Sequence, residues 1–345
     1  MREELKAFWH YTVGKFHYQT PPILTLLVTA RCNARCQHCF YWQKIDQKSK
    51  TELSLEEIER LSQELGHLEV LLIGGGEPFL RQDLVDIIRL FFENNQLGSV
   101  SIATNGLLPE KIENEVKRML QISTKLLIIV CPSIDGTEKV HDQIRGIKGA
   151  FLKATETYRR LRNLQKKYKN LRVRPNVAVF DTNKDNLYRL IDQVPSLFPD
   201  NYLLGLSLLR GEPRKKNLRL PSLDELKKLF DYKTKKLRGE RSWSSRLLER
   251  VIFATQVETL ARRKQVVPCE SGRLLGVVFE NGDVGFCELL PPIGNLKEKN
   301  FKQIWQSKKA KELREKIIKK KCFCTHECAL FPSLLAHPLV WLRLI

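Results

Sequence analysis

The sequence predicts an α/β protein in which a partial (β/α)6 barrel is followed by a small cysteine-rich domain. Up to about residue 210, short apolar runs rich in β-branched residues alternate with charged stretches of helical periodicity. Because parallel strands need a crossover between them, this alternation indicates parallel βα units. Further along the chain this alternation of strand and helix patterns ends and several cysteines occur. There, Asn281-Gly282 is a strong signal for a β-hairpin.

The apolar runs are each short enough for a buried parallel strand. They cover residues 23–28, 70–73, 100–103, 126–134, 173–179 and 203–209. Helical periodicity is found between them at residues 53–65, 82–92, 109–120, 150–167 and 183–198. Ligands of such a fold bind at the carboxyl ends of the strands, so we expect the functional site there.

The chain after residue 210 is expected to form a different structure. A basic, proline-containing stretch leads into helical segments at residues 223–237 and 245–262. Strands at 274–279 and 283–287 would flank Asn281-Gly282 in a type I′ turn, which needs φ > 0 at both central residues. We therefore divide the chain into an N-terminal extension (1–20), the barrel (21–210), a basic linker with helices (211–262), a cysteine-rich domain (263–328) and an apolar tail (329–345).

Composition indicates a folded protein with anionic partners. The 345 residues are 42% hydrophobic, and 59 Lys and Arg against 39 Asp and Glu give a net charge of +20. Such a field favours nucleic acids, phospholipid headgroups or phosphorylated metabolites. Residues 1–19 carry charge and aromatics in place of the apolar run of a secretory signal. We therefore expect the reducing cytoplasm, where the nine cysteines indicate metal ligands and not disulfides.

The first cysteine group follows directly after the first expected strand. Residues 31–40 read RCNARCQHCF, with Cys32, Cys36 and Cys39 separated by three and then two residues. Three thiolates can hold three irons of a four-iron cluster and leave the fourth iron open as a reaction site. The alternative is a zinc site completed by His38, but this ring would have to fold back onto its own loop.

Further motifs appear at strand ends in order: GGGEP at residues 74–78, TNG at 104–106 and SIDG at 133–136. With the cysteine loop they resemble the radical S-adenosylmethionine (radical SAM) superfamily, over roughly residues 21–210. The resemblance implies a [4Fe-4S] cluster on Cys32, Cys36 and Cys39, with SAM bound at the same face. The residues that it implies for SAM binding are Gly75, Gly76, Glu77, Pro78, Thr104, Asn105 and Ser133.

Two details of this site are expectations about single residues. Glycine in the GGGEP motif permits backbone to approach a ligand closely, so Gly76→Val should weaken SAM binding more than it destabilises the fold. The segment HDQIRG at residues 141–146 is similar to one found in members with extra clusters. Its Arg145 is expected either to bind a carboxylate of SAM or substrate bidentately or to form a surface ion pair. Phe40 and His38 are expected near the adenine.

The second cysteine group resembles the SPASM or twitch extension that binds auxiliary clusters in part of this superfamily. It comprises Cys269, Cys287, Cys322, Cys324 and Cys328. Five thiols are one more than a single [4Fe-4S] cluster needs, so one auxiliary cluster is expected. The C-x-C spacing is tighter than usual, which leaves open which of the last three ligate and whether His326 substitutes. A structural zinc is the alternative, and Cys131 is expected to be a buried small hydrophobe.

The resemblance implies an enzyme that reductively cleaves SAM to a 5′-deoxyadenosyl radical, which abstracts a substrate hydrogen. Electrons would come from a donor of the flavodoxin or ferredoxin type. The positive net charge and the apolar C-terminal tail favour a small or lipid-linked anionic substrate. The alternative is peptide or protein modification, which is disfavoured because only about twenty residues precede the first strand, fewer than a leader-binding domain needs.

Two further interpretations concern partners. A zinc-containing RNA-binding protein would explain charge and cysteines, but not GGGEP and SIDG at strand ends, and no aromatic-rich RNA-binding motif is present. Nucleic acid is therefore not expected as a partner. The tail at 329–345 follows the lysine-rich residues 308–321 and is too short and proline-broken for a membrane span. It either caps the protein or makes a peripheral membrane contact.

Overall fold

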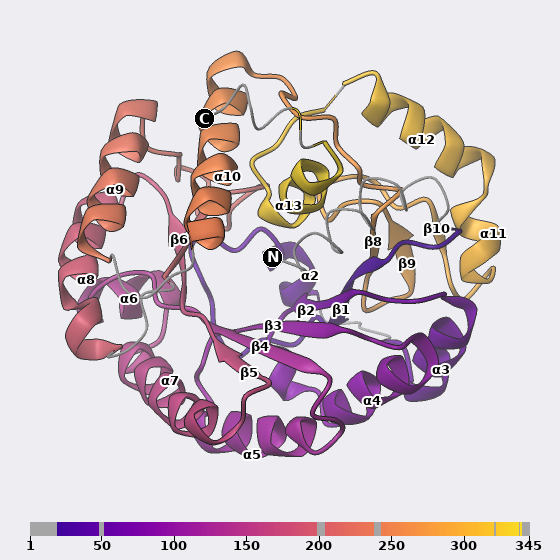
Figure 1. Ribbon diagram of the computed structural model, residues 1–345, viewed down its shortest axis with the longest axis horizontal. Helices are drawn as coiled ribbons and strands as arrows, with labels where there is room; N and C mark the ends of the chain where they lie inside the picture. Colours follow the sequence, from indigo (N-terminus) through magenta and orange to yellow (C-terminus); the bar gives the residue numbers. More distant parts are fainter. Residues whose placement is uncertain are drawn as a thin grey trace.

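The computed structural model describes residues 19–47, 52–198, 204–237, 243–320, 322–337 and 339. Most of the expected N-terminal extension, residues 1–18, and the end of the tail, residues 340–345, lie outside this part. Figure 1 shows strands in the middle of the molecule with helices arranged around them. The barrel strands are β1 (Ile23–Thr29), β2 (Val70–Gly75), β3 (Ser99–Thr104), β4 (Leu127–Pro132), β5 (Leu171–Val173), β6 (Asn176–Val179) and β7 (Gly205–Leu208).

The barrel strands run parallel and do not close into a ring within the described residues. One sheet has the order β10-β9-β8-β1-β2-β3-β4-β5, and a second sheet pairs β6 with β7. A parallel bridge between Ser133 and Asn176 joins the two sheets. The predicted fold class, a partial α/β barrel, is therefore confirmed.

One expected strand is divided. The apolar run at residues 173–179 forms β5 and β6 because Pro175 has no N–H for the ladder. Both pieces stay beside β4: Arg174 N donates to Val130 O at 2.9 Å, and Ile134 N donates to Asn176 O at 2.8 Å. The proline thus bends the sheet and starts the separate β6–β7 pair.

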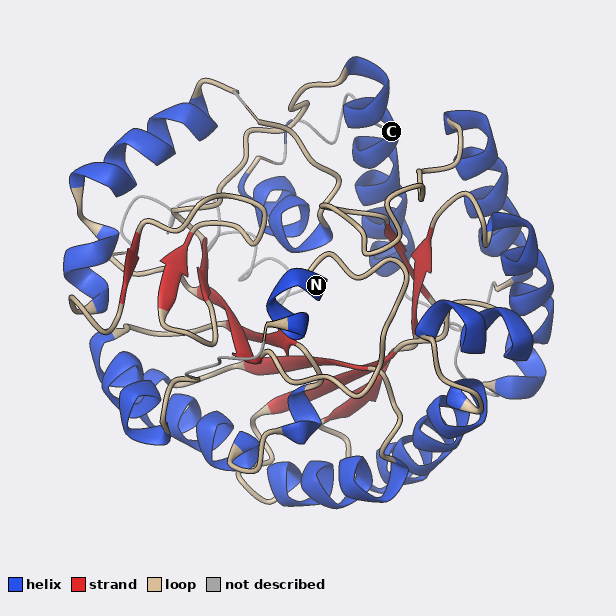
Figure 2. Ribbon diagram, turned by 180° about the vertical axis from the view of Figure 1, so that it is seen from behind, coloured by secondary structure: helices blue, strands red, loops and turns tan. Residues whose placement is uncertain are grey.

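Helices cover the outer face of the barrel sheet, as Figure 2 shows from behind. They are α3 (Leu55–Glu64), α4 (Leu84–Asn95), α5 (Pro109–Leu120), α7 (Ala150–Lys167) and α8 (Lys184–Leu197), while the short α6 (Glu138–Arg145) follows β4 and packs against α7. Local sequence sets their starts: Ser54 and Glu57 form a reciprocal capping box at α3, and Pro109 opens α5. Helix α6 was not expected from periodicity.

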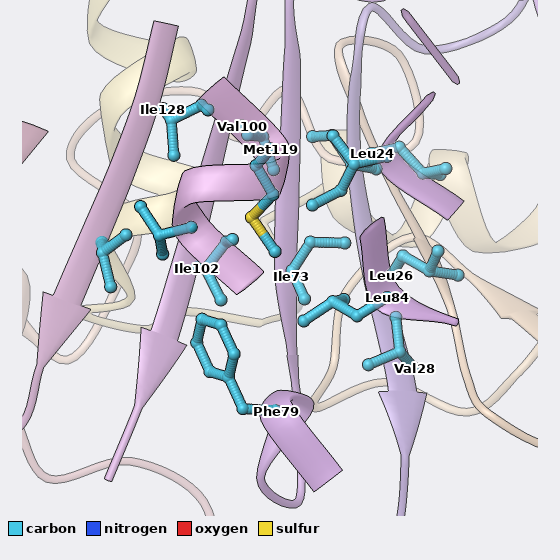
Figure 3. Close-up of a cluster of buried hydrophobic side chains, with 14 of the residues drawn as sticks. Leu24, Leu26, Val28, Ile73, Phe79, Leu84, Val100, Ile102, Met119 and Ile128 are labelled. Carbon is cyan, nitrogen blue, oxygen red and sulfur yellow. The ribbon is translucent and has the colours of Figure 1, made fainter. Parts of the chain in front are cut away.

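The core lies between this helical layer and the sheet. In Figure 3, Leu24, Ile73 and Val100 of neighbouring strands face Leu84 of α4 and Met119 of α5. These side chains are fully or almost fully buried. Each such burial contributes about 1.5–3 kcal/mol to hydrophobic stabilisation. This packing fixes the strands that carry the site on their carboxyl ends.

The C-terminal hairpin joins the barrel sheet. Its strands β8 (Leu275–Val278) and β9 (Asp283–Gly285) are antiparallel, and β8 pairs in parallel with β1. Only Gly282 of the turn has a positive φ, 91°, so the expected type I′ turn is wrong. Asn281 instead accepts a hydrogen bond from Asp283 N through its own side chain, which favours a different turn. β10 (Gly294–Asn295), α11 (Phe301–Trp305) and α12 (Lys308–Ile318) follow.

Three helices lie beside the open side of the barrel: α9 (Leu223–Lys236), α10 (Trp243–Arg262) and α13 (Glu327–Ala336). Helix α13 packs against α10 and buries Leu330 and Leu334. Ser333 accepts a hydrogen bond from Glu270 N at 3.0 Å, and His337 Nε2 lies 2.6 Å from Glu270 Oε1. Residues 329–337 of the tail therefore form a cap. Among the described residues, no helix is both long and apolar enough to cross a membrane.

Candidate active site

A cavity of about 230 Å³ lies at the carboxyl ends of the barrel strands. The thiols of Cys32, Cys36 and Cys39 line it, together with residues that follow the other strands. Of the residues expected to bind SAM, those at the cavity wall are Gly75, Gly76, Glu77, Thr104, Asn105, Ser133 and Arg145. Pro78 is buried at the start of the short helix η2 (Pro78–Leu80), beneath this wall.

Backbone hydrogen bonds from two directions hold the cysteine loop. Arg35 N donates to Arg145 O at 3.0 Å and Gln37 N to Ile144 O at 2.9 Å, which attaches the loop to the end of α6. On the other side, Arg214 N donates to Cys39 O at 3.1 Å. The basic stretch that follows β7, the last barrel strand, thus packs against the cysteine loop.

The chemistry of the thiols fits an iron-sulfur cluster. Arg145 Nη1 donates to Cys36 Sγ at 3.5 Å, and Asn105 Nδ2 lies 3.9 Å from Cys32 Sγ. Donors directed at sulfur are the usual surroundings of thiolate ligands. Burial raises the pKa of Cys32 to about 11 and that of Cys39 to about 12, so these thiols lose their protons only when a metal replaces them.

Glu77 is buried and uses its carboxylate within the chain. It accepts hydrogen bonds from Thr104 Oγ1 at 2.8 Å, Asn105 N at 2.7 Å and Phe79 N at 3.3 Å. Burial raises its pKa to about 7, against the effect of these donors. Glu77 therefore connects the end of β2 to the end of β3. This connection holds Thr104 and Asn105 at the cavity wall.

The fold itself requires glycine at Gly75 and Gly76 of the GGGEP motif, because both lie against backbone atoms at the end of β1. A Cβ on Gly76 would lie 2.1 Å from Arg31 O, and Gly75 has φ +106° with Thr29 O 2.4 Å from its Cβ position. Gly76 N also donates to Thr29 O at 2.7 Å. The expectation that Gly76→Val would act chiefly on SAM binding is therefore wrong, because the end of β2 is pressed against the end of β1.

Arg145 forms a buried ion pair, so the expected surface ion pair is wrong, while its binding to a carboxylate of SAM or substrate stays a prediction. Its Nη2 lies 2.6 Å from Asp135 Oδ2 in an ion pair that is buried at the end of β4. Burial opposes the charge of Arg145, but Asp135 and the Cys36 sulfur raise its pKa overall. Asp135 also accepts from Ala178 N at 2.9 Å. The pair joins β4, β6 and α6 beside the cysteine loop.

His38 presents an unused polar atom at the cavity. Its ring stacks on Phe180 with centroids 5.6 Å apart, and its Nδ1 is buried without a hydrogen-bond partner among the described residues. Burial lowers the pKa of His38 to about 4, so the imidazole is neutral. An orphaned nitrogen of this kind fits a polar ligand in the cavity.

Sequence reasoning missed Arg210, which follows β7. Its guanidinium lies over the Phe40 ring at 4.4 Å and pairs with Glu288 at 3.3 Å. It also contacts His326. The only sequence signal was its position directly after the last barrel strand. Arg210 thus connects the first cysteine loop with the region of the second cysteine group.

Four thiols of the second cysteine group, those of Cys269, Cys287, Cys322 and Cys324, influence one another electrostatically. Gln265 Oε1 accepts from Cys269 N at 3.3 Å, while its Nε2 donates to Cys322 Sγ at 3.6 Å. Burial raises the pKa of Cys324 to about 11, and the thiols of Cys269 and Cys322 add to this rise. Burial also raises the pKa of Cys287, with contributions from Cys324 and Cys269.

Cys328 stands apart at the start of α13. Burial raises its pKa to about 12, and its strongest electrostatic neighbours are Glu288 and Arg210. His326, considered above as a substitute ligand, is buried between Arg210 and Glu288, with its Nε2 3.4 Å from Glu288 Oε2. Among the described residues, no group of three or more His, Cys, Asp or Glu side chains converges on a single metal ion.

Together, the parallel partial barrel, the three thiols at its carboxyl edge and the second thiol group define an iron-sulfur protein with an open active-site cluster. Residues 26–186 match the model of the radical SAM superfamily, and residues 266–329 match the SPASM iron-sulfur cluster-binding domain. The chain therefore carries a radical SAM domain over residues 26–186 and a C-terminal SPASM domain over residues 266–329. This confirms the predicted cofactors: a [4Fe-4S] cluster with SAM, and auxiliary iron-sulfur binding. The zinc alternatives lose their support.

Curated relatives match parts of the chain. Fe-coproporphyrin III synthase of Methanosarcina barkeri is 33% identical over 187 residues, 53% of this chain and 42% of that protein. Pre-heme d1 synthase of Dinoroseobacter shibae is 25% identical over 214 residues, 61% of this chain and 50% of that protein. The chain thus spans half or less of the length of these relatives.

Solved structures share the fold over most of the chain. The AdoMet-bound structure of anSMEcpe has a TM-score of 0.63 at 18% identity, covering 94% of this chain and 98% of that one. Streptococcus suis SuiB bound to S-adenosylmethionine has a TM-score of 0.62 at 14% identity, covering 88% and 70%. At these identities the likeness shows the fold alone.

We predict that Gly76→Val destabilises the fold by about 2 kcal/mol or more, because its side chain would overlap backbone of the β1 end. Chemical unfolding measures this loss. Gly74→Ala is the matched control, since its Cβ would meet only the movable Leu27 side chain at 3.3 Å. A fully stable Gly76→Val protein would contradict the packing described here.

We also predict a pH-dependent stability difference between wild type and Glu77→Gln. The folded pKa of Glu77, about 7, exceeds the ordinary 4.5, so its contribution is full below pH 4.5 and is lost as pH rises through 7. Wild type should lose stability relative to the variant by up to about 1.4 kcal/mol per pH unit in this window. Urea unfolding at several pH values tests it, and a constant difference would show that Glu77 does not titrate there.

Proposed function

We propose that the protein reductively cleaves SAM to a 5′-deoxyadenosyl radical that abstracts hydrogen from a small organic anion. The radical SAM domain implies an enzyme; the substrate and the reaction type are our inference. One observation carries it: the three thiols and the residues that follow the barrel strands line one cavity. A cytoplasmic location and a flavodoxin- or ferredoxin-type electron donor belong to the same proposal.

The cluster, when bound, supplies the electron that breaks the sulfonium bond of SAM. The chain's own residues hold and shield the site. Cys32, Cys36 and Cys39 provide the ligands, while Arg145 and Asn105 direct their N–H groups at two of the sulfurs. The neutral His38 has Nδ1 available for a polar atom of the bound ligand.

Positive charge supports an anionic substrate. Arg210 lines the reaction cavity, and the chain carries a net charge of +20. Relatives named for Fe-coproporphyrin III and for GTP 3′,8-cyclisation also indicate anionic molecules. Peptide modification is the second candidate, because AlbA of Bacillus subtilis, named for subtilosin biosynthesis, is 28% identical over 54% of this chain.

For the auxiliary site we propose one [4Fe-4S] cluster held by Cys269, Cys287, Cys322 and Cys324. The support is the Gln265 link between Cys269 and Cys322 and the mutual electrostatic effects among the four thiols. Cys328 is then the thiol left over. Its position on α13, near Arg210 and Glu288, gives it a packing role.

We predict that anaerobically reconstituted, dithionite-reduced protein converts SAM to 5′-deoxyadenosine and methionine. Replacing Cys32, Cys36 and Cys39 together by Ala should reduce this conversion to background, because the open iron is lost. Cys131→Ala is the matched control, since Cys131 lies on β4 outside the loop and should retain conversion. Chromatography of the products measures the outcome. A triple variant that cleaves SAM as wild type does would place the site elsewhere.

We further predict about eight irons in wild type and about four in the triple variant. In the triple-variant background, Cys322→Ala or Cys324→Ala should lose the remaining iron and its absorption band, whereas Cys328→Ala should keep both. Iron analysis after reconstitution decides this. Iron loss with Cys328→Ala, matched by retention with Cys322→Ala, would reverse the assignment.

A further inference from the structure

A second cavity of about 320 Å³ lies on the open side of the barrel. Strands β4 to β7 form one wall, and helices α9, α10 and α13 form the other. Its lining is mainly apolar and includes Leu206, Leu229, Phe230, Phe253 and Phe331. Leu208 lines both this cavity and the reaction cavity, so the two adjoin at β7. A molecule bound here would reach toward the thiol-lined site.

The charged groups of this cavity differ in how they are used. Arg172 Nη1 donates to the carbonyl oxygens of Lys169 at 2.7 Å and Leu171 at 2.9 Å. Lys233 forms a buried ion pair with Glu249. Both cations therefore have partners within the protein, which leaves little of their charge for a ligand.

Arg174 is the exception. It is exposed at the cavity wall, and among the described residues its guanidinium has no hydrogen-bond or ion-pair partner. Glu327 lines the same cavity and interacts electrostatically with Arg174, but among the described residues the two form no direct ion pair. A guanidinium without a direct partner in a mainly apolar cavity is suited to a carboxylate, which it can bind through two parallel hydrogen bonds.

We propose that this cavity binds the substrate as an amphiphilic carboxylate, with Arg174 on the carboxylate and the apolar body along Leu206 and Phe253 toward Leu208. This rests on the proposed function and names its substrate class. The volume is at the lower end of ordinary ligand sites, which suits a single chain or ring of moderate size. The charge of Arg174 selects against a neutral analogue of the same length.

Decanoate and decan-1-ol are the probes, since they share an apolar chain and differ in charge. We expect calorimetry on the anaerobically reconstituted protein to show saturable one-site binding of decanoate. Decan-1-ol should bind at least tenfold more weakly. Arg174→Gln should weaken decanoate binding at least tenfold, whereas Arg172→Gln, the control two residues earlier in the chain, should change it less than twofold.

A second variant tests the apolar part independently. Leu206→Trp keeps Arg174 but fills the cavity from β7, and it should abolish decanoate binding; melting curves show that each variant is folded. Absence of saturable binding to wild type, equal binding of the alcohol, or unchanged binding to folded Arg174→Gln would overturn the inference. If wild type cleaves SAM but does not bind decanoate, only this inference fails. If wild type does not cleave SAM, the proposed function fails.

Discussion

Parallel pairing of β1 with β2 on one side and with β8 on the other determines where the chemistry of this protein can occur. Parallel strands all end at the same edge of a sheet. The cysteine loop leaves β1 there, the GGGEP turn leaves β2, and Arg210 follows β7. Residues that lie far apart in the sequence therefore line one cavity, and the same β1 pairing brings the SPASM hairpin beside the first cysteine loop.

Buried charges hold this edge together. Glu77 connects β2 with β3, Arg145 pairs with Asp135 beside the loop, and Arg210 pairs with Glu288 between the two cysteine groups. Removing one partner of the buried Arg145–Asp135 pair would leave an unpaired buried charge, which typically costs about 3–5 kcal/mol. The neutral His38 lies beside these groups, with its Nδ1 unpaired among the residues that the structure describes.

Most barrel strands and helices could be predicted from the sequence, as could the position of the cysteine loop after β1. Helices α5 and α7 have the bounds that periodicity predicted, because strong amphipathic patterns and clear breakers fix them locally. The division at Pro175 was missed because the apolar run continues across it. The roles of Gly76 and Glu77 could not be read from the motif, since they depend on contacts with Arg31 and Asn105 made only when strands pair.

The pairing of β1 with β8 has a consequence for synthesis of the chain. Leu24 pairs with Gly276, which leaves the ribosome roughly 250 residues later. At about 5–20 residues per second, one edge of β1 stays without its partner for roughly 10–50 s. During that interval the first cysteine loop also lacks Glu280, whose carboxylate binds the Tyr41 hydroxyl beside it. Until the SPASM hairpin is made, the nascent chain therefore leaves one edge of an apolar strand unpaired and the three-thiol loop without this contact.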